Sequence, residues 1–335
     1  MNCNRFLSLS LSLAIACLLV CNASMVQYAC AELPGDSSKL PKAKRIVFLG
    51  DSITYAGGYV SAIETAWIAE APDQSAELIN LGLPSETVSG LSEPGHAGGQ
   101  FPRPNLHERL TRILDQTKPD LVIACYGMND GIYYPNNEMR FNQFKSGMER
   151  LHKEVTDRGS SIIHLTPAFF DALPIQSRLL PAGRDEYPQP YAGYDDVLED
   201  YSNWLLSKRK DGWIVLDLHA AMKNEIKTRR LVDSTFTFAS DGVHPNAEGQ
   251  AVIARPLAEH WGLTINDQGL PNHPQANAIQ AIVAQKQSTL KHAWLTATRH
   301  LRPGIETGIP VADAEAKAQE WNRQAILLAK TPSKN

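Results

Sequence analysis

Five short apolar segments, separated by stretches with helical spacing, are the feature that most constrains how this chain can fold. They cover residues 45–49, 77–81, 121–126, 161–166 and 213–218. Each is rich in valine, isoleucine and leucine, and continuous hydrophobicity of this kind is typical of strands buried on both faces of a parallel sheet. Because helical patterns separate these segments between residues 44 and 262, the sequence predicts a three-layer α/β/α sandwich around a five-stranded parallel sheet.

Helices are expected between the strands and after the last one. Apolar side chains recur at intervals of three and four residues at positions 59–66, 106–114, 141–155, 197–205 and 251–257. Two longer amphipathic patterns, at residues 276–300 and 311–330, lie too far from the last strand to extend the sheet. We therefore expect an α/β domain at residues 32–264 and a helical extension at residues 265–335, which packs on the core or on a partner subunit.

The first 31 residues differ in character from the rest of the chain. Arg5 precedes an apolar stretch from Leu7 to Val20, and Y-A-C-A at residues 28–31 resembles a signal-peptidase site. The apolar stretch is shorter than the roughly 20 residues that a membrane span needs. We therefore expect residues 1–31 to be a signal peptide and the mature protein to be exported, periplasmic or secreted, without a membrane span. An uncleaved anchor and a lipoprotein are the alternatives.

Removal of such a leader changes what the composition implies. Four of the five cysteines lie in residues 1–31, and Cys125 lies in an apolar run where we expect a packed strand residue. The mature chain would then have no internal disulfide, so its stability must come from core burial. It would keep 31 basic and 36 acidic residues, a mildly acidic balance that disfavours nucleic-acid binding.

Polar motifs follow the predicted strands at the edge where open α/β sheets bind ligands. They are G-D-S at residues 50–52, N-L-G at 80–82, G-M-N-D at 127–130 and D-G-V-H at 241–244. Each motif alone has a simpler interpretation. A serine before a helix is usually a cap, an Asn-Asp pair is usually a turn, and D-x-x-H before a helix can be a capped turn.

Together, the four motifs contain the groups that acyl transfer requires. Ser52 could be the nucleophile, because a neighbouring base such as His244 can take its proton. Asp241, three residues before the histidine, can reach the other ring nitrogen and hold its tautomer. A tetrahedral intermediate also needs hydrogen-bond donors, and the Ser52 and Gly82 N–H groups and the Asn129 amide are suitable.

These motifs, in this order, resemble the SGNH (GDSL-like) hydrolases over about residues 44–262. The resemblance implies that family's flavodoxin-like fold for residues 32–264 and a serine esterase that uses no cofactor. It implies that Ser52 is the nucleophile, His244 the base and Asp241 the orienting acid, with Ser52, Gly82 and Asn129 as the oxyanion hole. The chain has Ser85 where the family often has glycine, and we expect this difference to affect loop shape.

The segment at residues 91–104 looks like a glycine-rich insertion at the rim of the site. His96, Phe101 and Arg103 in it could line a substrate pocket, although solvated loop residues are the simpler interpretation. Aromatic residues that follow strand ends could stack on a sugar or an acyl group. They are Tyr55, Tyr133, Tyr134 and Phe169.

By family analogy, we expect hydrolysis of short acyl esters, especially esters of carbohydrates. Acyl transfer to sugar hydroxyls is the alternative, together with lipase, arylesterase or thioesterase activity and with non-catalytic carbohydrate binding. The other histidines show no metal-binding spacing, so neither a metal nor another cofactor is expected. The sequence indicates no particular oligomeric state.

Overall fold

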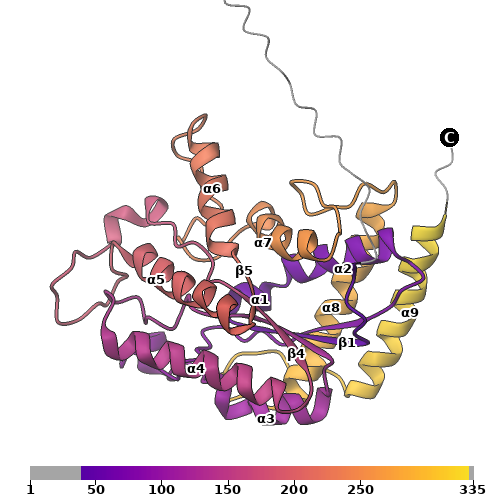
Figure 1. The fold of residues 1–335 in the computed structure, drawn as a ribbon, viewed down its shortest axis with the longest axis horizontal. Helices are drawn as coiled ribbons and strands as arrows, with labels where there is room; N and C mark the ends of the chain where they lie inside the picture. Colours follow the sequence, from indigo (N-terminus) through magenta and orange to yellow (C-terminus); the bar gives the residue numbers. More distant parts are fainter. Residues whose placement is uncertain (1–38, 332–335) are drawn as a thin grey trace, which may run out of the picture. The chain divides into compact units, whose positions relative to one another are not determined.

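A five-stranded parallel sheet lies at the centre of residues 39–331, the part of the chain that the structure, a computed structural model, describes (Figure 1). Its strands are β1 (Arg45–Gly50), β2 (Glu77–Asn80), β3 (Leu121–Cys125), β4 (Ser161–Leu165) and β5 (Ile214–Leu216). They are arranged in the order β2-β1-β3-β4-β5, and every neighbouring pair is parallel. The predicted fold is confirmed, and each strand end lies within two residues of its expected position.

Helices cover both faces of the sheet, which explains why most side chains of its strands are apolar (Figure 1). One layer consists of α2 (Gly58–Glu70), α6 (Leu218–Arg230) and α7 (Ala247–His260), in which α7 contacts the other two. The opposite layer consists of α3 (Leu106–Thr117), α4 (Glu138–Thr156) and α5 (Tyr194–Ser207). Contacts join α3 to α4, and Phe144 of α4 stacks on Tyr201 of α5.

Most of these helices were predicted, but α6 was not. Its buried apolar residues are Leu218, Met222 and Ile226, one in every four positions among charged neighbours, so the pattern is too narrow to stand out. Asp217 begins the helix by accepting a hydrogen bond from the Ala220 N–H (3.0 Å). The remaining short elements are α1 (Ser52–Ala56) and the 3₁₀ turns η2 (His96–Gly99), η3 (Leu173–Arg178) and η4 (Lys208–Asp211).

The two C-terminal helices, α8 (Ala276–Thr298) and α9 (Val311–Lys330), pack on each other and on the α/β core. Leu290 and Trp294 of α8 are buried in the main core, and α8 contacts α2, α3 and β2. Lys286 of α8, 4% exposed, donates to the buried Glu64 carboxylate of α2. The division into domains at residues 32–264 and 265–335 stays a prediction, although the helices share this core.

None of the helices in residues 39–331 has the length and apolar character that crossing a bilayer requires. The predicted signal peptide, residues 1–31, lies outside the described residues. Cys125 is a free, buried residue at the end of β3, as expected, and burial raises the pKa of its thiol.

Asp130 fastens the loop after β3 to the loop after β2. Its Oδ1 accepts hydrogen bonds from the N–H groups of Val88 and Ser89, both at 2.8 Å. The side chain is fully buried, and this burial raises its pKa from the ordinary 3.8 to about 6, although the two N–H donors act in the opposite direction. Asp130 also lies in a turn, its N–H donating to the Gly127 carbonyl oxygen (3.1 Å), as is usual for an Asn-Asp pair. The folded protein holds a proton on its carboxyl in mild acid.

Replacing Asp130 with asparagine should make folding stability less dependent on pH. In the wild type, the contribution of the Asp130 carboxyl to the free energy of unfolding is fully present below about pH 4, because the carboxyl is then protonated in both the folded and the unfolded chain. It is lost as the pH rises through about 6, at about 1.4 kcal/mol per pH unit and about 3 kcal/mol in all. Urea titrations at about pH 4, 5, 6 and 7 should therefore show Asp130→Asn gaining about this much relative to wild type. A difference that stays constant over this range would contradict the assignment.

Candidate active site

The turn after β1 places Ser52 at the first position of helix α1. Asp51 is the N-cap, because its Oδ1 accepts a hydrogen bond from the Ile53 N–H (2.9 Å). The capping function considered for Ser52 therefore belongs to its neighbour, and the serine hydroxyl is left for other contacts. The Ser52 N–H lies in the first helical turn, where backbone donors have no intrahelical acceptor.

Two glycines allow α1 to approach the carboxyl ends of the strands. A Cβ atom on Gly82 would lie 2.4 Å from the Tyr55 backbone nitrogen, which is closer than such atoms can come. A Cβ atom on Gly50 would lie 2.1 Å from Thr54 Oγ1 and 2.7 Å from the Cys125 carbonyl oxygen. The glycines of the G-D-S and N-L-G motifs are thus required by close packing around the helix that carries Ser52.

Ser85, where the family often has glycine, also lies in the loop after β2. Its φ of 67° falls in the left-handed region, where glycine is free of strain and other residues are not. The serine thus adopts the backbone conformation that glycine favours, and its effect on loop shape stays a prediction.

Ser52, His244 and Asp241 form a hydrogen-bonded row. The Oγ atom of Ser52 lies 2.8 Å from Nε2 of His244, and Nδ1 of His244 lies 2.6 Å from Oδ2 of Asp241. The other carboxylate oxygen, Oδ1, accepts from the N–H groups of Val243 (2.9 Å) and His244 (2.8 Å). Since a carboxylate only accepts, the neutral ring carries its proton on Nδ1, and Nε2 can accept the serine hydroxyl proton.

The surroundings of Asp241 favour its ionised form. Partial burial would by itself raise the pKa of this carboxyl, but the hydrogen bonds from His244 and Val243 outweigh it and hold the pKa below its usual value. An ionised carboxylate at Nδ1 can stabilise an imidazolium that forms when Nε2 accepts a proton.

Of the backbone donors expected in an oxyanion hole, the Gly82 N–H is already engaged. It donates to Oδ1 of Asn80 at 2.9 Å, and Nδ2 of Asn80 donates in turn to the Thr54 carbonyl oxygen at 2.7 Å. Asn80 therefore connects β2 to α1, a function that the sequence pattern did not distinguish from that of Gly82. The glycine could serve an oxyanion only by sharing or exchanging this bond.

The Asn129 side chain differs from Gly82, because its donor is largely free. Its amide oxygen is well bonded and its amide nitrogen is not. Oδ1 accepts from Nη1 of Arg103 (2.8 Å) and from the Tyr133 hydroxyl (3.4 Å). Nδ2 makes one long hydrogen bond, to the Glu86 carbonyl oxygen (3.4 Å). Within residues 39–331, one proton of this buried amide is therefore left for a ligand.

The structure divides the predicted lining residues into two groups. Arg103 and Tyr133 contact the site directly through Asn129, and Tyr133 stacks on Tyr194, with ring centroids 4.8 Å apart. The other five contact neighbouring side chains, and their role as substrate-lining residues stays a prediction. These contacts are Tyr55 with His292, His96 with Phe101, Tyr134 with Tyr187, and Phe169 with His219.

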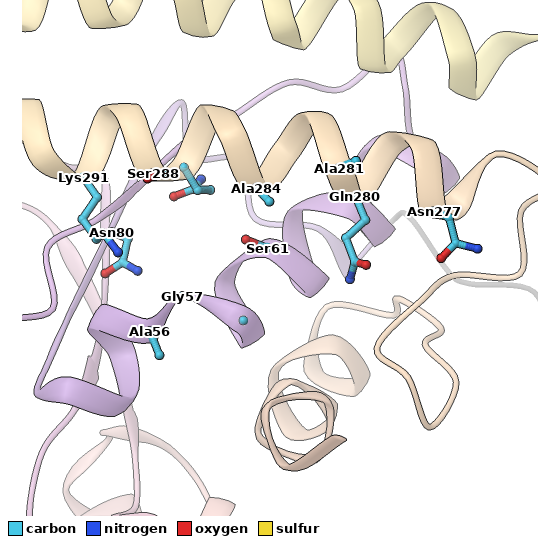
Figure 2. A pocket seen from close by; sticks show the side chains of 12 residues that line it. Ala56, Gly57, Ser61, Asn80, Asn277, Gln280, Ala281, Ala284, Ser288 and Lys291 are labelled. Carbon is cyan, nitrogen blue, oxygen red and sulfur yellow. The ribbon is translucent and has the colours of Figure 1, made fainter. Parts of the chain in front are cut away.

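A cavity of about 400 Å³ lies between α8 and the corner where α1 meets α2 (Figure 2). Its α8 wall presents Asn277, Gln280, Ser288 and Lys291, opposite Gly57, Ser61 and Asn80. Neither Ser52 nor His244 is among its lining residues, so the cavity is separate from the hydrogen-bonded row of Ser52, His244 and Asp241. Sequence reasoning missed it because its polar residues resemble a solvated helix face.

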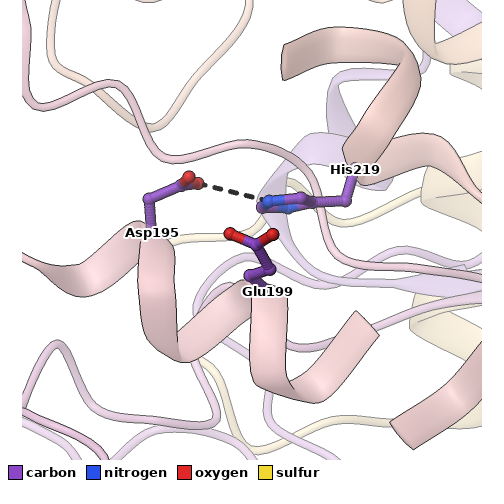
Figure 3. Close-up of side chains that lie close together, drawn as sticks. All are labelled: Asp195, Glu199 and His219. Atoms are coloured by element: carbon purple, nitrogen blue, oxygen red, sulfur yellow. Dashed lines mark ion pairs between the residues drawn. The ribbon is translucent and has the colours of Figure 1, made fainter. Parts of the chain in front are cut away.

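Three potential metal ligands also lie together, which their sequence spacing did not predict. Ligand atoms of Asp195, Glu199 and His219 are within 4.8 Å of one another (Figure 3). However, Nζ of Lys223 donates to Asp195 Oδ2 (2.9 Å) and to Glu199 Oε2 (2.7 Å). The lysine ammonium already pairs with both carboxylates, so this group is explained as an ion-pair cluster.

Comparisons with solved structures agree with the fold. The acetylxylan esterase Axe2 from Geobacillus stearothermophilus has a TM-score of 0.50 and 20% identity, covering 68% of this chain and 97% of that one. BT4096, described as a gut microbial diltiazem-metabolizing enzyme, has a TM-score of 0.53 and 20% identity, covering 67% of this chain and 48% of that one.

Sequence comparisons identify the family. An arylesterase from Vibrio mimicus is 26% identical over 141 residues, which are 42% of this chain. The match spans 60% of that relative's length. Residues 48–252, more than half of the chain, match the GDSL-like Lipase/Acylhydrolase family. The chain therefore belongs to the GDSL-like lipase/acylhydrolase family, as its motifs predicted.

Proposed function

We propose that this protein is a serine esterase in which Ser52 attacks the carbonyl carbon of an ester. The observation that carries the proposal is the hydrogen-bonded row, with Oγ 2.8 Å from Nε2 and Nδ1 2.6 Å from the Asp241 carboxylate. His244 takes the serine proton as the new bond forms and returns it to the departing alcohol oxygen. Water then attacks the acyl-enzyme, with His244 again as the base, and releases the acid.

The oxyanion of each tetrahedral intermediate would be bound by the Ser52 N–H and by Nδ2 of Asn129. Both groups follow the ends of strands adjacent in the sheet, and within residues 39–331 both have a proton without a close protein acceptor. Gly82 would join them by turning its N–H from Asn80 toward the ligand. The Ser52 and Asn129 donors, which need not move, would stabilise the charge without reorganising during the reaction.

The substrate class that we propose is short acyl esters of carbohydrates. Support comes from the fold shared with an acetylxylan esterase and from the polar rim next to Asn129. There the Arg103 guanidinium, paired with Glu93, contacts Asn129 and lies over the Tyr133 ring at 5.3 Å. An acetyl group needs little apolar surface, whereas a long acyl chain would have to lie against this ion pair.

We also propose that the protein is exported after cleavage behind Ala31. The support is the charged, apolar and small-residue pattern of residues 1–31. Expressed with its full leader in a bacterial host, the mature protein should be found outside the cytoplasm with Glu32 as its first residue by N-terminal sequencing. A soluble cytoplasmic product that keeps Met1 would contradict this.

Ser52→Ala and His244→Ala should each lower kcat/KM for an aryl acetate by about 10⁴-fold or more, since neither group acts without the other. The double variant should be little worse than either single variant. His260→Ala is a matched control, because this histidine lies at the end of α7 outside the hydrogen-bonded row. Losses that multiply in the double variant would show that the two residues do not act as one unit.

Activity should not increase with acyl chain length. Each buried methylene could contribute about 0.8 kcal/mol in an apolar groove, but the ion pair beside Asn129 offers no such groove. Initial rates on acetyl, butyryl and octanoyl aryl esters and on acetylated xylooligosaccharides should favour acetyl substrates. Product analysis with excess sugar separates hydrolysis from acyl transfer. A tenfold preference for octanoyl esters would overturn the substrate class and leave the serine mechanism intact.

A further inference from the structure

The insertion at residues 91–104 brings one arginine into the candidate active site. Arg103 is 8% exposed, although a solvated position was the simpler expectation from sequence. Its Nη1 donates to Oδ1 of Asn129 at 2.8 Å. Its Nε and Nη2 donate to the two carboxylate oxygens of Glu93, each at 2.7 Å. Arg103 thus links the insertion to the amide that we assign to the oxyanion hole.

This contact decides which way the Asn129 amide points. The oxygen and the nitrogen of an asparagine side chain are nearly equal in size, so hydrogen bonds and not packing select between the two orientations. A guanidinium can only donate, so the atom facing Arg103 must be the amide oxygen. Nδ2 is consequently directed away from Arg103. The Tyr133 hydroxyl reaches the same oxygen at 3.4 Å and reinforces this orientation.

We propose that Arg103 is a positioning residue of the oxyanion hole, which holds Asn129 with Nδ2 directed at the developing oxyanion. This inference rests on the proposed esterase function. A cationic donor on Oδ1 also polarises the amide, so that Nδ2 becomes a better hydrogen-bond donor. Loss of Arg103 would allow the amide to turn over or move, and the acceptor oxygen would then face the negative charge.

The surroundings of Arg103 keep it in this position. The Glu93 carboxylate binds it in a bidentate manner, and the Arg103 backbone N–H donates to Ser92 Oγ at 2.9 Å. The guanidinium also lies over the Tyr133 ring, with 5.3 Å between Cζ and the ring centroid. Tyr133 and the preceding Ile132 both have left-handed backbones, with φ of 60° and 48°, an unusual conformation that turns Tyr133 back toward Asn129.

Two other roles for Arg103 make different predictions. If the ion pair with Glu93 only stabilised the loop, substitutions would lower the melting temperature and leave the kinetics of the folded enzyme unchanged. If Arg103 bound the substrate directly, its loss would raise KM. A positioning residue lowers kcat with little change in KM, because the oxyanion is absent from the enzyme–substrate complex and develops only in the transition state.

The test is a double-mutant cycle between Arg103 and Asn129, measured with an aryl acetate. Arg103→Met keeps the length of the side chain and removes every donor. It should lower kcat by about 10- to 100-fold, which is less than the 10²–10³-fold typical of losing an oxyanion donor altogether. KM should stay within about twofold. In the Asn129→Ala background, the same substitution should change kcat by less than about threefold, since the amide that it positions is gone.

Two further variants complete the experiment. Arg103→Lys keeps a cation that only donates and should recover part of the kcat lost in Arg103→Met. If Arg103→Met does not fold, the cycle is run with Arg103→Lys, which should show a smaller effect and the same dependence on Asn129. Arg302→Gln is the matched control. It removes a guanidinium that lies over Phe101 of the same insertion, 5.1 Å from the ring centroid, and should leave kcat unchanged.

The outcomes separate this inference from the esterase proposal. Equal loss of kcat from Arg103→Met with and without Asn129 would overturn the positioning role, as would a change confined to KM. If Ser52→Ala is inactive, the proposed serine mechanism survives either of these two results for Arg103→Met. Full activity in Ser52→Ala would instead overturn the proposed function itself.

Discussion

The contact between Ser52 and His244 joins residues that are 192 positions apart in the chain, and the rest of the structure is arranged to make it possible. In a parallel sheet, all carboxyl ends meet at one edge, so loops from distant strands converge there. The same arrangement brings Asn129, after β3, beside the helix that follows β1, because these strands are neighbours in the sheet. A 2.8 Å contact therefore depends on strand order as much as on the residues that make it.

Much of the fold and of the candidate site could be predicted because short stretches of sequence carry the signals for them. Continuous apolar runs marked the strands. The polar motifs that follow β1 and β3 contained Ser52 and Asn129, and the motif before α7 contained His244. Helix α6 escaped because it buries only a narrow stripe of apolar residues. Arg103 was misjudged for a different reason: a charged residue in a glycine-rich loop looks solvated until its partners, Glu93 and Asn129, are placed around it.

Asn80 and Gly82 show a related limit of sequence reasoning. The motif N-L-G suggested a glycine N–H for the oxyanion hole, and the structure shows that the asparagine of the same motif accepts that N–H. Glycine is needed at position 82 because α1 approaches the loop after β2 so closely that no Cβ fits there. A short motif can reveal that a backbone passes close to a site, but only coordinates reveal where its donor points.

Two arginines, Arg103 and Arg109, approach the residues proposed for the oxyanion hole from different elements, and both are paired with buried or half-buried carboxylates. Arg109 of α3 donates to the Leu81 carbonyl oxygen (2.7 Å), next to Gly82, and to the fully buried Glu86, which also accepts from the Tyr126 hydroxyl. Buried ion pairs of this kind add little net stability compared with apolar packing. Apolar packing, however, cannot select the orientation of a peptide group or an amide. Directional donors can, which would explain why Arg103 and Arg109 lie next to Asn129 and Gly82 if these two bind a negative charge at a defined position, as proposed.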